Sequence, residues 1–175
     1  KDSQSYNSSF LIEKMLEGDD YRCLCIGCKV VSISKRVPPS VVGDGKSTVE
    51  ELIDQINSTR SDKRTGMLSK IPKDPHLISH LKKQGLNLND VLESNKKVFV
   101  RQNANLNTGG FSINYPVNKL HIKTKQAIEK AAKLVGLQVT GVDVMCRDLS
   151  EELSEDNGNI IEMNAKPRFR MHEAP

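Results

Sequence analysis

Aromatic side chains are scarce in this sequence: tryptophan is absent, and aromatic residues make up 4% of the 175 positions. Proteins that read single-stranded RNA stack its bases on such side chains, so the scarcity argues against a basic RNA-binding domain. The sequence also lacks a large excess of either charge, because 26 basic and 22 acidic residues are interspersed and leave a net charge of +4. A nucleic-acid-binding protein would show a clustered basic patch. We therefore expect no nucleic acid partner, while anions such as nucleotide phosphates remain possible ligands.

Long hydrophobic runs and a secretory signal are absent as well. No apolar run approaches the roughly 20 residues that span a bilayer, so we expect no membrane partner. The length suits one domain, or one domain with an excursion. The first residue is Lys rather than Met, and we expect the chain to be a fragment of a longer protein.

The four cysteines do not form a recognisable metal-binding pattern. Cys23, Cys25 and Cys28 are spaced as Cys-x-Cys-x-x-Cys, and Cys146 is remote in sequence. A structural zinc site needs a fourth ligand and paired spacing, so free, partly buried thiols are the better interpretation and zinc is the alternative. Reduced thiols are typical of a cytoplasmic protein, which is the location we expect.

Apolar and β-branched runs bounded by turn residues predict an α/β (α+β) fold with a mostly antiparallel sheet. We expect a strand at 10–16, a hairpin formed by 21–26 and 29–33, and strands at 97–101 and 137–145. The strongest helix pattern covers residues 121–135, where apolar residues recur at helical period and a glycine follows.

Residues 43–95 read as a small helical and loop insertion within one partial domain that spans residues 1–175. Ser47 or Thr48 can cap a helix at 49–57, and Glu50 would complete a capping box with Ser47. The segment 75–85 predicts a helix with Pro at its start and Gly after its end. A short helix is predicted at 88–92.

Oxygen-bearing side chains recur in the last two predicted strands, which a polar hairpin-type loop connects. Side chains alternate along a strand, so Glu162 and Asn164 point the same way, while Ile161 and Met163 should point into the core. Asp143 stands alone between apolar residues in the preceding strand. Two carboxylates and an amide oxygen suit Mg²⁺, which proteins hold through carboxylates plus substrate phosphates. The alternative is an exposed, solvated sheet face.

An amide-rich loop at 102–108 ends in Gly109-Gly110 and follows Arg101. Glycine-bearing loops can present backbone N–H groups to an anion, and Arg101 at the strand end could face the same anion as a planar donor. A plain surface turn would explain the glycine pair equally well.

Taken together, these motifs resemble the ATP-grasp ligases. The matching segments run in collinear order over nearly the whole chain, at 10–22, 36–46, 103–110, 141–143 and 161–172. Within that family the cyanophycin synthetases are most similar, and the ATP-grasp half of bifunctional glutathione synthetases fits the last motif less well. The resemblance implies the C-terminal part of an ATP-grasp core, with the N-terminal part missing.

The resemblance also implies an activity. ATP-grasp ligases phosphorylate a carboxylate with ATP, and an amine then attacks the acyl phosphate to form an amide bond. In the cyanophycin synthetases this step adds aspartate to a poly-aspartate backbone. The alternatives are a glutathione-synthetase-like ligase and a non-catalytic nucleotide-binding module that keeps only the fold. The implied partners are ATP, Mg²⁺ and an amino-acid or peptide substrate, with a homo-oligomer in the full-length protein.

Roles carry over to individual residues through the matched motifs. The resemblance assigns adenine and ribose binding to Glu13, Lys14, Met15, Leu16 and Asp20, and Mg²⁺ binding to Asp143, Glu162 and Asn164. It assigns stabilisation of phosphate or a developing oxyanion to Arg101, Gly109 and Gly110, with Arg170 as a second catalytic cation. Weaker candidates for binding the acceptor or the incoming amino acid are Arg36, Lys46 and His172, with Arg170 again.

Three departures from the family pattern bear on these roles. The family usually has Pro-Gly where this chain has Pro167-Arg168, and Ser47 stands where the family has a histidine. The lysines and the glycine-rich flap that grip ATP phosphates in this family lie upstream of the given sequence. We therefore expect these 175 residues alone to bind ATP poorly and to catalyse no ligation.

Overall fold

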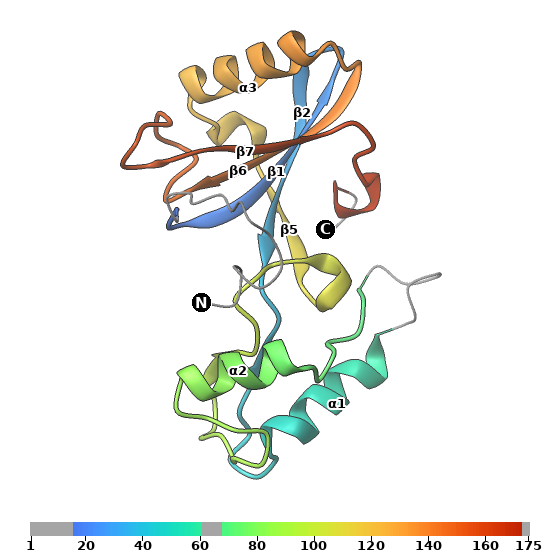
Figure 1. The fold of residues 1–175 in the computed structure, drawn as a ribbon, viewed down its shortest axis with the longest axis vertical. Helices are drawn as coiled ribbons and strands as arrows, with labels where there is room; N and C mark the ends of the chain where they lie inside the picture. Colours follow the sequence, from blue (N-terminus) through green and yellow to red (C-terminus); the bar gives the residue numbers. More distant parts are fainter. Residues whose placement is uncertain (1–15, 61–67, 173–175) are drawn as a thin grey trace, which may run out of the picture.

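The computed structural model describes residues 16–60 and 68–172, with a sheet and one helix above and a smaller helical part below (Figure 1). The predicted strand at 10–16 and the candidate residues Glu13, Lys14 and Met15 lie outside these ranges, apart from Leu16. In chain order the elements are β1 (Asp19–Ile26), β2 (Lys29–Val37), β3 (Ser40–Val42), α1 (Val49–Thr59), α2 (Pro75–Lys83), β4 (Lys97–Phe99), η2 (Leu106–Thr108), β5 (Phe111–Tyr115), η3 (Val117–Lys119), α3 (Ile122–Val135), β6 (Val139–Cys146), β7 (Gly158–Asn164) and η4 (Phe169–His172).

The main sheet has five strands in the order β5-β2-β1-β6-β7, and every neighbouring pair is antiparallel. The mixed α/β prediction with an antiparallel sheet is confirmed, as is the hairpin of β1 and β2. Gly27 and Cys28 form its turn with φ values of 56° and 61°, the left-handed conformation that two-residue hairpins favour. The edge strand β5, which pairs with β2, was not predicted, although its apolar residues Phe111, Ile113 and Tyr115 alternate with polar ones.

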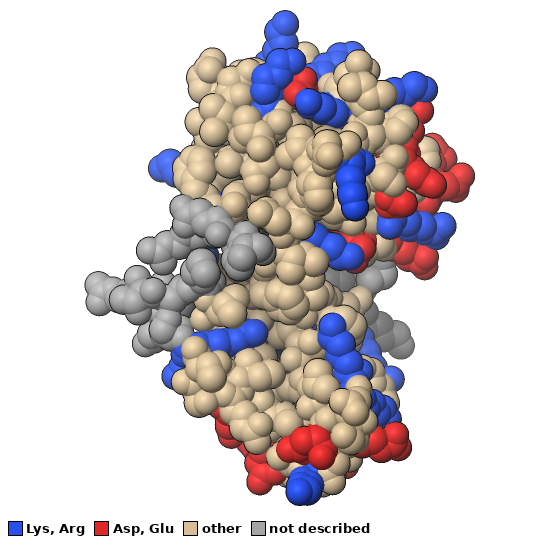
Figure 2. All heavy atoms as spheres, turned by 180° about the vertical axis from the view of Figure 1, so that it is seen from behind, with Lys and Arg blue, Asp and Glu red and all other residues tan. Residues whose placement is uncertain are grey.

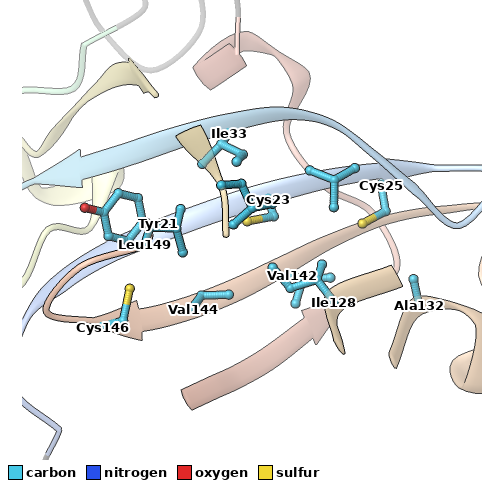
Figure 3. Close-up of a cluster of buried hydrophobic side chains, with 12 residues drawn as sticks. Tyr21, Cys23, Cys25, Ile33, Ile128, Ala132, Val142, Val144, Cys146 and Leu149 are labelled. Atoms are coloured by element: carbon cyan, nitrogen blue, oxygen red, sulfur yellow. The ribbon is translucent and has the colours of Figure 1, made fainter. Parts of the chain in front are cut away.

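One face of this sheet packs against α3 and forms the main core (Figure 3). Tyr21, Cys23 and Cys25 alternate along β1 toward the helix, where Ile128 and Ala132 are fully buried. Full burial of one such aliphatic side chain contributes about 1.5–3 kcal/mol. Twelve buried residues build this cluster: Tyr21, Cys23, Cys25, Val30, Ile33, Leu120, Ile128, Ala132, Val142, Val144, Cys146 and Leu149.

The cysteines belong to this core rather than to a metal centre. All four are free thiols, and Cys23, Cys25 and Cys146 are buried while Cys28 sits in the hairpin turn. Burial raises the pKa of Cys25 to about 11, so its sulfur stays protonated at neutral pH. Protonated, buried thiols act as small apolar side chains.

A second core is built by residues between 41 and 100, below the sheet in Figure 1. Helices α1 and α2 pack on the two-stranded sheet of β3 and β4. Its buried residues are Val41, Val49, Leu52, Ile53, Ile71, Leu77, Leu81, Leu92, Val98 and Val100. The predicted helices at 49–57 and 75–85 are confirmed, with ends that differ by two residues at most.

The capping box of α1 differs from the prediction by one residue. Thr48 is the N-cap: its hydroxyl accepts the Glu51 N–H at 3.2 Å, and Glu51 accepts the Thr48 N–H at 2.8 Å. Ser47 instead donates its hydroxyl to Asp44 at 2.7 Å. The proposed pairing of Ser47 with Glu50 is therefore wrong, because Asp44 competes for Ser47 in the preceding turn.

The short helix predicted at 88–92 is wrong as well. The segment forms a loop whose backbone carbonyls face the start of α1. The N–H groups of Val49 and Glu50 donate to the carbonyl oxygens of Asp90 and Leu88, each at 2.9 Å. The first N–H groups of a helix have no partner inside it, so this loop satisfies donors that would otherwise stay unpaired. Three apolar residues in a five-residue stretch were too weak a signal to separate such a loop from a helix.

A β-bulge interrupts the pairing of β6 with β7. Asp143 lies opposite Glu162, but Val144 lies opposite Ile160, so Ile161 is the extra residue. The predicted burial of Ile161 is wrong, since it is 55% exposed, whereas Met163 packs against the main core as expected. None of the helices in the described residues could span a membrane. Figure 2 shows basic and acidic side chains interspersed over the face of the molecule that it draws.

Candidate functional site

The sheet face opposite α3 is polar, because alternation places the charged residues of four strands there. Asp20 and Arg22 alternate with the buried residues of β1, and Asp20 pairs in register with Arg36 of β2. Arg22 lies directly opposite Asp143 of β6, and Asp143 lies directly opposite Glu162 of β7. The register therefore brings residues from the two ends of the chain into one row across the sheet.

This row lines a cavity of about 500 Å³. The lining residues come from the sheet, from the loop before η2 and from the segment after β7: Asp20, Arg22, Arg36, Asn103, Ala104, Asn105, Leu106, Asn107, Asp143, Met145, Ile161, Glu162, Asn164, Lys166, Arg168 and Met171. We call it the polar cavity. Of the predicted site residues it brings together Asp20, Arg36, Asp143, Glu162 and Asn164.

Two arginines hold the carboxylate of Asp143. Arg22 forms an ion pair with it through Nε and donates from Nη2 to Oδ2 at 2.9 Å. The Nη2 group of Arg36 lies 3.1 Å from the same Oδ2, while its Nε donates to Asp20 at 2.9 Å. Arg22 is 9% exposed and Asp143 6%, so this pairing is shielded from water. Burial raises the pKa of Asp20, and the hydrogen bond from Arg36 offsets part of that effect.

The remaining predicted metal ligands are less constrained. Glu162 is exposed, and no hydrogen bond or ion pair joins it to another described residue. The Nδ2 atom of Asn164 is buried without a hydrogen-bond partner among the described residues. Buried polar atoms normally have partners, so this N–H₂ group can donate to an anion in the cavity, whereas a cation would bind the amide oxygen of Asn164.

The donor set fits a magnesium ion that brings other ligands with it. Within the part of the chain that the structure describes, no three His, Cys, Asp or Glu side chains meet in a metal-holding group. Asp143, Glu162 and Asn164 supply two carboxylates and one amide, and Asp143 is partly neutralised by its arginines. Mg²⁺ is usually bound by one or two carboxylates together with water and phosphate oxygens, which matches this incomplete set.

The loop before β5 meets the polar cavity through its asparagines, not through its glycines. The Gly110 N–H donates to the Asn105 carbonyl at 3.1 Å, and the Gly109 carbonyl accepts from Arg60 at 2.6 Å. Both glycines are buried, and neither lines the cavity. Asn107 accepts a hydrogen bond from Arg168 at 2.8 Å, which links this loop to the segment after β7. The glycine pair thus shapes the loop that carries the cavity-lining residues Asn103, Asn105 and Asn107.

Arg101 lies outside the polar cavity. Its guanidinium makes a two-point contact with Asp74, at 2.9 and 3.1 Å, and reaches the carbonyl of Pro72 at 3.3 Å. Asp74 is also the N-cap of α2. Lys46 is exposed in the turn before α1 and does not line the cavity either. The catalytic role of Arg101 and the substrate role of Lys46 stay predictions.

His172 and Arg170 lie in η4, beside the cavity-lining Met171. The Nδ1 atom of His172 is 3.0 Å from the Ser32 hydroxyl and 3.2 Å from the Ser34 hydroxyl. Burial, with repulsion from Arg22, lowers the pKa of His172 to about 4. The imidazole is therefore neutral at physiological pH, and the roles of both residues remain predictions.

A second hollow adjoins the polar cavity. It has a volume of about 580 Å³ and shares Met145 and Ile161 with the cavity. Leu16 and Ile160 also line it, so it is more apolar than its neighbour. Of the predicted adenine-binding residues, Leu16 is the one that the structure describes, and it lies here.

Sequence reasoning gave no role to Arg22 or Lys166, both of which line the polar cavity. For Arg22 the signal was present: it stands two residues after Asp20 on a strand, so alternation puts both on the same face. Its proximity to Asp143 could not be derived, because 121 residues separate the two in sequence.

No family model matches the chain. It is 40% identical over 174 residues to a cyanophycin synthetase of Synechocystis sp., covering 98% of this chain and 20% of that protein. It is 37% identical over 174 residues to the glutathione biosynthesis bifunctional protein GshAB of Clostridium perfringens, covering 97% and 22%. The chain thus spans about one fifth of the length of these curated relatives.

A solved structure has the same fold. The crystal structure of a bifunctional glutathione synthetase from Pasteurella multocida superposes with a TM-score of 0.72 at 32% identity, over 90% of this chain and 22% of that one. The chain is homologous to one segment of these ligases, and its architecture is that of a partial ATP-grasp core.

Proposed function

We propose that this chain, a homologue of the ATP-grasp segment of cyanophycin and bifunctional glutathione synthetases, is part of an ATP- and Mg²⁺-dependent carboxylate–amine ligase. The reaction forms an acyl phosphate from ATP and a carboxylate, and an amine then displaces phosphate to give an amide. The observation that carries the proposal is the cross-strand pair of Asp143 and Glu162 on the wall of the polar cavity.

The polar cavity suits the phosphate end of the nucleotide. Asp143, Glu162 and Asn164 would hold Mg²⁺, which supplies charge neutralisation to the transferring phosphoryl group. The side chains of Asn103, Asn105 and Asn107 line the same space and carry hydrogen-bond donors, and Arg36 adds a positive charge to its wall. Donors already oriented toward developing negative charge give the largest catalytic benefit, because they need no reorganisation during the reaction.

The adjoining hollow suits the base of the nucleotide. Leu16, Met145 and Ile160 offer an apolar surface for an adenine ring, and Asp20 on the cavity side would bind the ribose hydroxyls. We also retain Glu13, Lys14 and Met15 as adenine-binding residues, although they lie outside the described residues. The continuity of the two hollows through Ile161 supports this orientation.

We assign the remaining candidates as follows. Arg170 and Arg101 are the catalytic cations, with Arg101 acting from outside the cavity, and Gly109 and Gly110 shape the loop that meets the phosphates. Arg36, Lys46 and His172 remain candidates for substrate binding.

Residues 1–175 form part of one ATP-grasp domain, and residues 43–95 form an insertion in it. We place the full-length protein in the cytoplasm as a homo-oligomer.

The finer proposal is addition of aspartate to a poly-aspartate backbone. Its support is the identity to cyanophycin synthetases over nearly the whole chain, together with two cations on the cavity wall, Lys166 and Arg168, which suit an acidic acceptor. A glutathione-synthetase-like ligase is the second candidate, favoured by the similarity to GshAB proteins. A non-catalytic nucleotide-binding module is the third.

One experiment separates these candidates. The full-length protein is given ATP and Mg²⁺ with either aspartate and a poly-aspartate primer or glycine and γ-glutamylcysteine, and ADP release is measured. Ligation with the first pair alone supports the finer proposal. Ligation with the second pair alone would replace it by the glutathione reaction. Nucleotide binding without ADP release under either condition, unaffected by Asp143→Asn, would support the non-catalytic module.

A further inference from the structure

Asp143 already has its negative charge compensated by protein groups. Arg22 uses two nitrogens on this one carboxylate, and both side chains are almost fully buried. Arg36 approaches Asp143 from β2 but divides its donors between Asp143 and Asp20. Two acids and two arginines thus form a balanced cluster on the cavity wall.

The position of Arg22 is built into the neighbouring strand. A Cβ atom at Gly141 would lie 2.7 Å from Nη1 and 2.8 Å from Cδ of Arg22, closer than non-bonded atoms can approach. Gly141 therefore leaves the space in which the Arg22 side chain lies. Because Arg22 also pairs with Asp143 in register, its guanidinium is fixed against that carboxylate.

This arrangement disfavours a metal ion that arrives alone. A divalent cation bound to Asp143 would face the guanidinium of Arg22 across a shielded, low-dielectric space, where repulsion between like charges is strong. Glu162 is then the one predicted carboxylate ligand without a compensating cation among the described residues. Phosphate oxygens that arrive with the cation would supply the missing negative charge.

We propose that Arg22 is a positioning residue that makes divalent-cation binding conditional on bound nucleotide. It orients Asp143 toward the cavity and neutralises enough of its charge that the free cation binds weakly. This inference rests on the proposed function, because it takes Asp143 as a ligand of the magnesium ion. It predicts that removal of the Arg22 charge has opposite effects on the binding of free and nucleotide-bound cations.

The test uses Mn²⁺ as the probe, with the free ion measured by electron paramagnetic resonance in the full-length protein. Titrations are run with and without a non-hydrolysable ATP analogue. Arg22→Gln keeps a hydrogen-bond donor but removes the charge, whereas Arg22→Lys keeps the charge. Lys29→Gln is the matched control, since Lys29 is exposed and pairs with Glu129 at the hairpin.

Arg22→Gln should bind Mn²⁺ about tenfold more tightly than the unaltered protein in the absence of nucleotide, the order expected for one unit charge near the ion. With the analogue present it should bind Mn²⁺ several-fold more weakly, because Asp143 is no longer oriented. Arg22→Lys should keep the weak binding of free Mn²⁺, and Lys29→Gln should match the unaltered protein throughout.

Two results would overturn the inference: unchanged or weaker binding of free Mn²⁺ in Arg22→Gln, or tight binding of free Mn²⁺ in Arg22→Lys. If Arg22→Gln melts below the measuring temperature, the Arg22→Lys titration decides alone. A failure of the unaltered protein to bind Mn²⁺ even with the analogue would instead overturn the proposed function. Nucleotide-dependent Mn²⁺ binding that is the same in the Arg22 variants and in the unaltered protein would overturn the inference and leave the proposed function standing.

Discussion

Arg101 and Asp74 meet through two hydrogen bonds of 2.9 and 3.1 Å, and the same carboxylate accepts the Leu77 N–H at 3.0 Å to cap α2. Arg101, two residues after β4, is thereby tied to the first turn of a helix in the second core. A residue that the motif pattern marks as catalytic thus also has a structural partner.

Replacement of Arg101 separates these two roles. Arg101→Met should lower the free energy of unfolding by about 2 kcal/mol, because charged hydrogen bonds are lost and the buried guanidinium is removed. Asp74→Asn should cost less, since the amide oxygen still caps the helix. Thermal and urea unfolding measure the loss of unfolding free energy in each of these two variants. If Arg101 also acts in catalysis, Arg101→Met lowers kcat well beyond Asp74→Asn at temperatures where both variants are folded, and equal kcat values would refute that role.

Asp74 also predicts a dependence of stability on pH. Burial raises the pKa of this carboxyl, but the hydrogen bonds from the Leu77 N–H and Arg101 outweigh burial and leave it below the usual value. A carboxyl with a depressed pKa stabilises the fold above its unfolded pKa of about 4, and that contribution is lost as the pH falls through the folded value. Urea midpoints between pH 7 and pH 3 should therefore fall less steeply in Asp74→Asn. Identical slopes would contradict the assignment.

The two candidate metal-binding carboxylates should differ in their effect on stability. Asp143→Asn leaves two arginines facing a neutral amide in a shielded site and should cost about 3 kcal/mol. Glu162→Gln changes an exposed side chain and should stay within about 0.5 kcal/mol of the unaltered protein. Both should abolish nucleotide-dependent Mn²⁺ binding. Normal binding in a folded Glu162→Gln variant would remove Glu162 from the site.

Gly109 provides a test of how the loop before β5 is held. Its φ is 94°, and a Cβ atom there would lie 2.5 Å from Cγ1 of Ile71, so Gly109→Ala should destabilise by about 2–3 kcal/mol and displace the asparagines of the polar cavity. Gly136→Ala is the control, because its φ is 74° but nothing lies within 4 Å of the new atom. It should cost about 1 kcal/mol and leave nucleotide affinity unchanged. Equal losses of stability in the two variants would show that the contact with Ile71 has no effect.

Arg168 follows Pro167, at a position where the resemblance to ATP-grasp ligases predicts glycine. Arg168→Gly removes the hydrogen bond to Asn107 and one cation from the cavity wall. Because the side chain is exposed, stability should change by less than about 1 kcal/mol. The KM for an acidic acceptor should rise several-fold with little change in the KM for ATP. Arg147→Gly, which removes an exposed pair with Glu17, is the control and should change neither KM.

Local patterns predicted most of the elements because each carries its own signal. The helix α3 follows from a stripe that contains Ile128 and Ala132, and the first hairpin follows from two strands around Gly27. The loop at 88–92 was mispredicted because its conformation depends on unpaired donors of a helix 40 residues earlier in the chain. No local pattern contains that information.

The candidate site could be predicted in part for the same reason. The pairing of Asp143 with Glu162 was accessible because a polar loop at 147–157 joins two strands that are consecutive in the chain. The ion pair of Arg22 with Asp143 was not, since it depends on the order of strands in the sheet. Arg101 was matched by motif, but its contact with Asp74 depends on the packing of the second core.

The bulge at Ile161 explains how one strand serves two faces that differ in chemistry. Ile160 and Met163 both pack against the main core although they are three residues apart, and Glu162 faces the other side. Strict two-residue alternation cannot satisfy both requirements. Deletion of Ile161 would leave Ile160 and Met163 two residues apart, so regular alternation could keep both in the core with Glu162 on the other face, but the side chain that lines both hollows would be lost. The extra residue in β7 is therefore needed for the walls of the two hollows and not for the apolar layer.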